Sequence, residues 1–287
     1  MVLKQLLGSD SPAAFMQEHF LRLPFALAGG CSHLAAFGDW PVVERVLSSP
    51  EADIIVGSAD QRFEGKTPTS LEEARRLLSQ GLTVGVRHAE KHDDSLAELA
   101  CGFATDFAAP IDIHLYCTPA DKPGFGWHYD AEDVFVLQTR GKKEWWLRKN
   151  TVNPWPLVET LPKDMKYERE IMPAIRCLLA AGDWLYIPAG YWHRTECLEE
   201  SISLSVGIES PSAMSVFDFL RPQLLESLRW RQRLPPVGEA TSLSQEELLT
   251  ELQTLLESLG SDLAKLLANK GTAESFLNSL RQRTGGS

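Results

Sequence analysis

From about residue 110 onward the chain consists of short β-rich runs separated by turn residues, and this pattern restricts the fold more than any other feature. Residues 111–117 alternate apolar and polar side chains, as expected for a strand with one buried face. The runs that predict strands are residues 111–117, 133–139, 144–147, 184–187 and 201–208. Several short strands with Gly and Pro between them favour a sandwich or a barrel.

The segment before these strands mixes helix and strand signals. Residues 69–78 have the capping residue and the apolar spacing of an amphipathic helix that ends at Gly81. A strand is predicted at residues 82–86, and a second helix at residues 95–107. We therefore expect residues 1–108 to supply α/β elements that pack on a β-rich core.

Beyond the last predicted strand the pattern becomes helical. Ser244 and Glu247 have the spacing of a capping box, in which the serine accepts a hydrogen bond and the glutamate reaches back. Leucines recur at helical spacing behind this box as far as Gly260, and further leucines extend the pattern: Leu248, Leu249, Leu252, Leu255, Leu256, Leu259, Leu263, Leu266 and Leu267. The expected organisation is a mainly β core at residues 109–211 followed by a helical segment at residues 212–287.

The composition is that of a globular protein in a reducing compartment. Hydrophobic residues make up 44% and charged residues 23% of the 287 residues, a balance that argues against disorder. No run reaches the roughly 18 apolar residues that span a bilayer, and the N-terminus lacks the long apolar region of a signal peptide. The five cysteines are scattered without a CxxC pair, so we expect reduced thiols and a cytoplasmic location.

The formal net charge of −11 bears on the choice of partner. Sequence-independent binding of nucleic acid needs clustered Lys and Arg, so we expect no direct nucleic-acid binding. The acidity suits a basic protein partner, and it is equally explained by solubility alone.

Three side chains are candidates to hold a metal ion. In a strand, His128 and Asp130 face the same side and can converge on one ion. A Pro-Ala-Gly turn after residues 184–187 presents His193 as a third ligand. Two imidazoles and one carboxylate are typical of non-haem Fe(II) oxygenases, which keep positions open for O2 and a co-substrate. Zinc enzymes also combine three protein ligands with an open position, so the donors alone do not fix the metal.

A second histidine pair, His88 and His92, lies four residues apart and could chelate a metal on one helix face. The surrounding stretch is rich in charge, and its order does not match H-E-x-x-H. We therefore interpret this pair as surface residues. The cysteines lack a matched base, so nucleophilic catalysis is not favoured.

Four stretches of the β-rich region resemble JmjC-type 2-oxoglutarate oxygenases, and they are most similar to the branch that hydroxylates ribosomal proteins. In chain order they resemble the strand before the first metal motif, that motif, the second metal motif and the closing strand: residues 115–119, 125–138 with 141–145, 182–188 with 192–193, and 204–207. The similarity covers about residues 111–211. It implies a double-stranded β-helix, the jelly-roll of the cupins, with Fe(II) held by His128, Asp130 and His193.

The resemblance also implies how the co-substrate 2-oxoglutarate is held. Lys143 lies where these enzymes place the cation for its distal carboxylate, and a buried lysine needs such an anion. Tyr116 matches a co-substrate tyrosine, and His114 projects to the same face of its strand. On the closing strand Ser205, or Ser203, stands where some members carry an asparagine. Each of these positions also has a purely structural interpretation.

The function that the resemblance implies is hydroxylation of a protein side chain, with 2-oxoglutarate and O2 converted to succinate and CO2. A small molecule or a modified nucleoside is an alternative substrate. Two further alternatives are a metal cupin without 2-oxoglutarate chemistry, such as an isomerase, and a non-catalytic binding module. The C-terminal helices resemble in position a dimerisation segment, so a homodimer is expected, with a helical cap on the chain's own barrel as the alternative.

Overall fold

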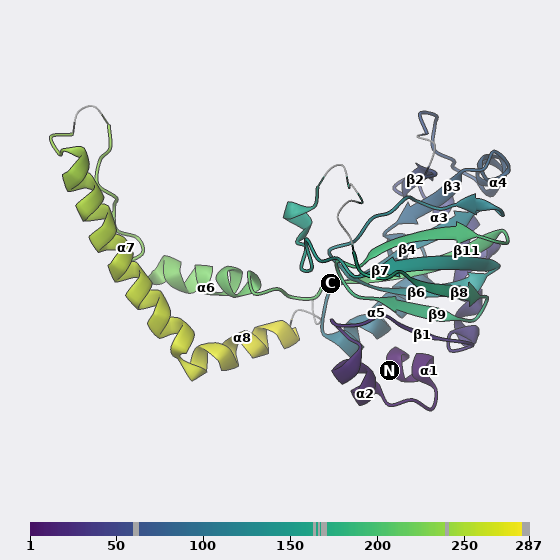
Figure 1. Cartoon of the computed structure of the whole chain (residues 1–287), viewed down its shortest axis with the longest axis horizontal. Coiled ribbons are helices and arrows are strands. Elements are labelled where there is room, and N and C mark those ends of the chain that lie inside the picture. The colour runs from purple at the N-terminus through teal and green to yellow at the C-terminus, as the bar shows by residue number, and fades with distance from the viewer. Residues whose placement is uncertain (60–62, 163–164, 166, 168–170, 239–240, 283–287) are drawn as a thin grey trace. The chain divides into compact units, whose positions relative to one another are not determined.

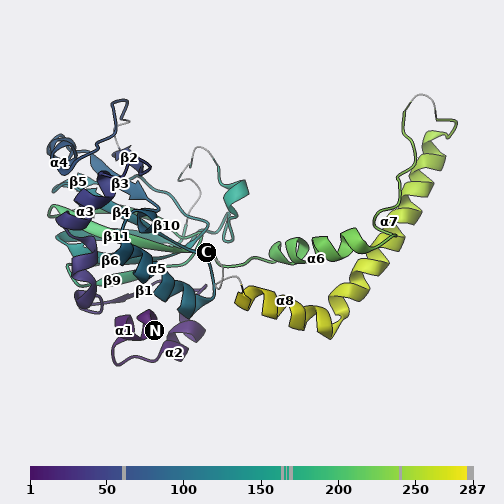
Figure 2. The same ribbon diagram turned by 180° about the vertical axis from the view of Figure 1, so that it is seen from behind.

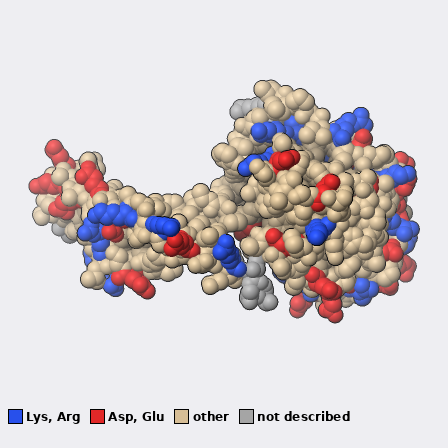
Figure 3. Space-filling model, turned by 90° about the horizontal axis from the view of Figure 1, so that it is seen from below, with Lys and Arg blue, Asp and Glu red and all other residues tan. Residues whose placement is uncertain are grey.

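The computed structural model describes residues 1–59, 63–162, 165, 167, 171–238 and 241–282. The chain forms two compact units, Met1–Ser210 and Pro211–Ser287. No helix in these described ranges is long and apolar enough to cross a membrane. Acidic and basic side chains are interspersed over the face drawn in Figure 3.

Two antiparallel sheets form the first unit (Figure 1). The larger sheet has seven strands, in the spatial order β1 (Phe25–Leu27), β9 (Trp184–Ile187), β6 (Asp133–Arg140), β11 (Ser201–Ile208), β4 (Ile111–Thr118), β3 (Thr83–Arg87) and β2 (Asp53–Gly57). The smaller sheet has four, in the order β5 (Lys122–Pro123), β10 (Trp192–Cys197), β7 (Lys142–Arg148) and β8 (Ile175–Ala180). Every strand predicted by its residue range is present, but His128 and Asp130, which were expected in a strand, lie in the loop between β5 and β6. The larger sheet also takes three strands from residues 25–87, so a domain boundary at residue 108 stays a prediction.

Helices of the first unit cover the outer face of the larger sheet, as α3 and α5 do in Figure 2. The helical elements are α1 (Val2–Leu7), α2 (Pro12–Glu18), η1 (Ser32–Gly38), α3 (Trp40–Leu47), α4 (Leu71–Ser79), η2 (Ala89–Lys91), α5 (Asp94–Phe107) and η3 (Val158–Thr160). The predicted N-terminal cap of α4 is formed, because Ser70 Oγ accepts a hydrogen bond from the backbone N–H of Glu73. Such a cap stabilises a helix by about 1 kcal/mol.

Strand alternation divides the apolar side chains of the first unit into two cores. Phe135 of β6 and Trp184 of β9 face outward and pack with Phe15 and Phe103 from the covering helices. The intervening side chains of the same strands face the smaller sheet and form a second core with Leu147. Strands buried on both faces are apolar almost throughout. The space between the sheets is thereby filled at one end and left open to polar groups elsewhere.

The second unit contains three helices, α6 (Ser215–Glu226), α7 (Gln245–Ala268) and α8 (Lys270–Gln282). The predicted capping box is present at the start of α7, where Ser244 and Glu247 exchange hydrogen bonds. Helix α7 continues through Gly260, at which the strongest part of the leucine pattern ended. No side chain of α7 or α8 is fully buried in the described part of this unit, and Leu249, Leu256 and Leu267 of α7 are exposed.

Candidate metal centre

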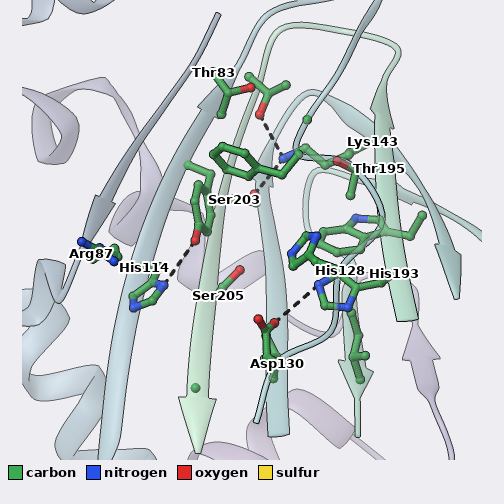
Figure 4. Close-up of a pocket in the computed structure, with 18 of the residues that line it drawn as sticks. Thr83, Arg87, His114, His128, Asp130, Lys143, His193, Thr195, Ser203 and Ser205 are labelled. Carbon is green, nitrogen blue, oxygen red and sulfur yellow. Dashed lines mark hydrogen bonds and ion pairs between the residues drawn. The ribbon is translucent and has the colours of Figure 1, made fainter. Parts of the chain in front are cut away.

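A cavity of about 340 Å³ lies between the two sheets of the first unit (Figure 4). Polar side chains of β4 and β11 form one wall, namely Asp112, His114, Tyr116, Ser203 and Ser205. The smaller sheet supplies Lys143 and Trp145 from β7, and His193 and Thr195 from β10. The loop before β6 adds His128, Asp130 and Glu132. All seven predicted site residues therefore meet in one cavity.

The three predicted metal ligands are brought together by a backbone bridge between distant segments. His128 and His193 exchange two backbone hydrogen bonds of 3.1 and 2.8 Å, which set their rings 4.2 Å apart between centroids. Asp130 Oδ2 lies 3.5 Å from His193 Nε2. One donor atom from each of the three residues lies within 4.8 Å of the others, the separation that a single cation can bridge.

Backbone carbonyls fix the tautomer of both imidazoles. His128 Nδ1 lies 2.7 Å from the carbonyl oxygen of Gly126, and His193 Nδ1 lies 3.0 Å from that of Tyr191. A carbonyl only accepts, so each Nδ1 carries the proton and each Nε2 offers a lone pair. Burial lowers the pKa of His193 to about 4, and the adjacent His128 adds to this shift. The imidazole of His193 is therefore neutral at pH 7 and able to bind a metal ion.

A glycine turn joins the third ligand to the loop of the other two. Gly190 adopts φ 79°, and its N–H donates to the backbone carbonyl of Asp130 at 2.8 Å. A Cβ at this position would lie 2.9 Å from the carbonyl oxygen of Pro154. Glycine is thus required both by the left-handed backbone and by the close approach of a neighbouring loop.

Lys143 is a buried cation whose partners are neutral. Its side chain is 3% exposed, and its ammonium donates to Ser203 Oγ at 3.1 Å and to Thr118 Oγ1 at 3.3 Å. Burial lowers the pKa of Lys143. Among the residues that the structure describes, no carboxylate forms an ion pair with it. Because an isolated charge is costly to bury, this end of the cavity is suited to an anion.

The remaining predicted cavity residues lie on the wall of β4 and β11. His114 Nδ1 is 3.2 Å from the hydroxyl of Tyr116, and Ser205 is paired with His114 across the ladder. Ser203, rather than Ser205, contacts Lys143. The roles assigned to Tyr116, His114 and Ser205 in co-substrate binding stay predictions.

Two carboxylates at the other end of this wall were not singled out from the sequence. Burial, together with the charges of Asp112 and Asp130, raises the pKa of Glu132 to about 7. A Cβ on Gly207 would clash with the carboxylates of Asp112 and Glu132, so the glycine makes room for them. Asp112 and Glu132 are twenty positions apart, and no local motif indicates that they meet.

The chain is similar to one family model and to several curated proteins. Residues 88–216 match the family model described as the JmjC domain. Ribosomal oxygenase 1 of Gallus gallus is 26% identical over 259 residues, which cover 80% of this chain and 41% of the relative. The bifunctional lysine-specific demethylase and histidyl-hydroxylase NO66 of Dictyostelium discoideum is 33% identical over 151 residues, covering 51% of this chain and 28% of the relative. The chain thus spans less than half the length of these curated relatives.

Solved structures show the same fold. The X-ray structure of Escherichia coli ycfD aligns with a TM-score of 0.55 at 20% identity, covering 88% of this chain and 68% of that one. A second structure, of the ribosomal oxygenase YcfD with cobalt and 2-oxoglutarate, aligns with a TM-score of 0.52 at 19% identity, covering 96% and 71%. The predicted jelly-roll fold of the cupins is therefore confirmed.

Replacement of Lys143 by Met should stabilise the protein freed of metal and co-substrate. The substitution keeps the volume of the side chain and removes the buried charge, so we expect the free energy of unfolding in urea to rise by about 1–3 kcal/mol. The folded protein holds the Lys143 proton less tightly than the unfolded chain, whose pKa is near 10.5. The free energy of unfolding of the wild type should then increase as the pH rises toward that value. The difference in this free energy between K143M and wild type should therefore become smaller.

The matched control is Lys142→Met, one residue away. Lys142 is half-exposed and pairs with Glu199 at 2.7 Å, an ion pair at the surface. Its loss should change the free energy of unfolding by less than about 1 kcal/mol. A K143M protein less stable than wild type by more than this amount would show that Lys143 is not an unfavourable buried charge.

Proposed function

Residues 88–216 of this chain form a JmjC domain, and from this premise we propose that the protein is an Fe(II)- and 2-oxoglutarate-dependent oxygenase. One observation carries the proposal: the His128–Asp130–His193 triad, with both Nε2 lone pairs available, shares a cavity with the buried ammonium of Lys143. A cation site and an anion site in one cavity match a co-substrate that chelates a metal and carries a distal carboxylate.

The residues of the triad suit ferrous iron. His128, Asp130 and His193 would hold the ion on one face and leave the other positions for 2-oxoglutarate and O2. Iron and 2-oxoglutarate, when bound, supply the oxidation by which O2 and 2-oxoglutarate yield succinate, CO2 and a hydroxylated substrate. The chain's own part is to orient the ligands through the carbonyls of Gly126 and Tyr191.

Lys143 has the geometry for the distal carboxylate. Its ammonium already lies between two hydroxyls, Thr118 Oγ1 and Ser203 Oγ, which can donate to the same anion. Charge-assisted hydrogen bonds in a buried site are about twice as strong as neutral ones. A metal cupin without a co-substrate would have no use for an unpaired cation at this depth, which disfavours that alternative.

The test of this proposal is the anaerobic absorption spectrum of the protein with Fe(II) and 2-oxoglutarate. A visible metal-to-ligand charge-transfer band should appear for wild type and be lost in H193A, because a triad ligand is gone. In K143A the band should form only at 2-oxoglutarate concentrations at least about 30-fold higher, since about 2 kcal/mol or more is lost with a buried charged partner.

K142A serves as the control and should titrate like wild type, because Lys142 points to solvent. Equal 2-oxoglutarate affinity in K143A and wild type would favour a metal cupin that does not use this co-substrate. A wild-type spectrum without any band would reject the proposed function itself.

The prime substrate that we propose is a protein side chain, as in a ribosomal protein. The names of the relatives support it, since they include a ribosomal oxygenase and a histidyl-hydroxylase. The cavity supports it too: at the end opposite Lys143, the carboxyl group of Glu132 can hydrogen-bond a polar side chain that enters there. A small molecule or modified nucleoside remains the alternative substrate.

Mass spectrometry of ribosomal proteins incubated with the loaded enzyme under ¹⁸O₂ tests the substrate class. We expect one peptide to gain the mass of a single ¹⁸O atom, and the same incubation with H193A to leave it unchanged. Succinate formation that is stimulated by small molecules or nucleosides, with no labelled peptide, would contradict the protein substrate while leaving the oxygenase activity intact.

We also propose that α7 mediates homodimer formation. Leu249 and Leu256 are 59% and 64% exposed, and they lie seven residues apart on one face of the helix. Apolar side chains exposed on one face of a helix are suited to contact with a second copy of the chain. A cytoplasmic location is proposed as well, and it is supported by the five free cysteines.

Light scattering across a range of protein concentrations tests the dimer. Wild type should have about twice the chain mass of 32.0 kDa, whereas L249E/L256E should have the mass of one chain. Thr250→Glu/Thr254→Glu adds the same charge to α7 away from the face of Leu249 and Leu256 and should remain dimeric. A wild-type protein with the mass of a single chain at all concentrations would exclude the dimer.

A further inference from the structure

A second group of metal-binding side chains lies beside the candidate active site. His88 follows β3, and Asp112 and His114 lie two residues apart on β4, so the two β4 side chains face the same way. One donor atom from each residue lies within 4.8 Å of the other two. Figure 4 shows His114 on the opposite side of the view from His193. The two clusters share no residue.

The donor atoms of this cluster are too far apart for hydrogen bonds, but they are close enough to share an ion. His114 Nε2 lies 3.6 Å and His88 Nδ1 lies 3.8 Å from the same oxygen, Oδ2 of Asp112. Both separations exceed hydrogen-bond length. Ligands bonded to zinc at 2.0–2.1 Å in a tetrahedron are about 3.3 Å apart, so these two separations need a contraction of about half an ångström or less, and the two imidazole nitrogens lie within 4.8 Å of each other.

Two atoms of the cluster are buried without a hydrogen-bond partner. His114 Nε2 and Asp112 Oδ1 are shielded from solvent, and neither has a hydrogen-bond partner. Such atoms are rare in folded proteins because each costs about 1–3 kcal/mol. The other nitrogen of His114 lies 3.2 Å from the Tyr116 hydroxyl, which can accept its proton, and Nε2 faces Asp112, with which it forms an ion pair at 3.6 Å.

The backbone holds the third ligand in place. His88 adopts φ 51°, the left-handed region, at the junction of β3 and η2. Two residues on, the carboxylate of Glu90 accepts the backbone N–H of Ile113 at 2.8 Å and so ties this turn to β4. The turn and the strand that carry the three donors are therefore joined directly beside them.

We propose that His88, Asp112 and His114 form a second metal site that binds Zn²⁺ with one coordination position open. Two imidazoles and one carboxylate are a common zinc donor set, and zinc accepts a tetrahedral geometry. The ion would join the end of β3 to β4. It would also place positive charge on the cavity wall that carries Glu132.

The experiment counts zinc ions bound to protein stripped of metal with a chelator, by calorimetric titration with Zn²⁺. Wild type should bind two ions, and H193A, which disables the triad, should bind one. In H193A, the added substitution His88→Asn or Asp112→Asn should weaken the remaining site more than about 100-fold, because it removes one of three ligands. Asn keeps the left-handed backbone at position 88 and the side-chain shape at position 112.

The control combines H193A with His33→Ala, an exposed histidine of η1 outside the cluster, and this variant should still bind one ion. Circular dichroism of each variant checks that it is folded. Failure of folded H193A to bind zinc, or undiminished binding after His88→Asn and Asp112→Asn, would overturn the second site. The oxygenase proposal is tested by the charge-transfer band instead, so the two proposals can fail separately.

Discussion

The pair of backbone hydrogen bonds between His128 and His193 is the interaction on which the site depends. It joins a loop and a strand that are 65 positions apart, and it places the two imidazoles side by side. The carbonyls of Gly126 and Tyr191 then orient the rings. Because the ligands are already oriented, binding a cation needs little rearrangement of these side chains.

The cavity has a polar and an apolar end because neighbouring strands of one sheet present different side chains to it. β4 and β11 turn hydroxyls, an imidazole and a carboxylate inward, whereas β6 and β9 turn Val136 and Leu185 inward to a dry core. The unpaired charge of Lys143 lies against the hydroxyls, where its hydrogen bonds are satisfied although its charge is not. The apolar side chains can therefore stabilise the barrel at one end, while the polar side chains form the candidate site at the other end.

The meeting of His128, Asp130, His193 and Lys143 in one cavity could be predicted from the order of motifs, and the elements with strong local signals could be predicted from alternation or capping. Alternation marked β4 and β11, a capping box marked α7, and a familiar order of motifs linked His128 to His193. Strand β10 was not predicted, because its inward side chains His193 and Thr195 are polar, and its sequence therefore lacks the alternation of apolar and polar residues that indicates a strand. The contacts of Ser203 and the cluster around Asp112 depend on pairing between distant strands, which no local pattern encodes.

The alternation of β11 limits how such a cavity can diversify. Ser203, Ser205 and Gly207 face inward, and Leu204 and Val206 face the outer core. Inserting or deleting one residue would exchange the two sets, exposing leucine to the reactants and burying hydroxyls among helices. Lineages descended from this barrel can therefore alter their chemistry by exchanging individual side chains on such strands, while changes in length are confined to the connecting loops.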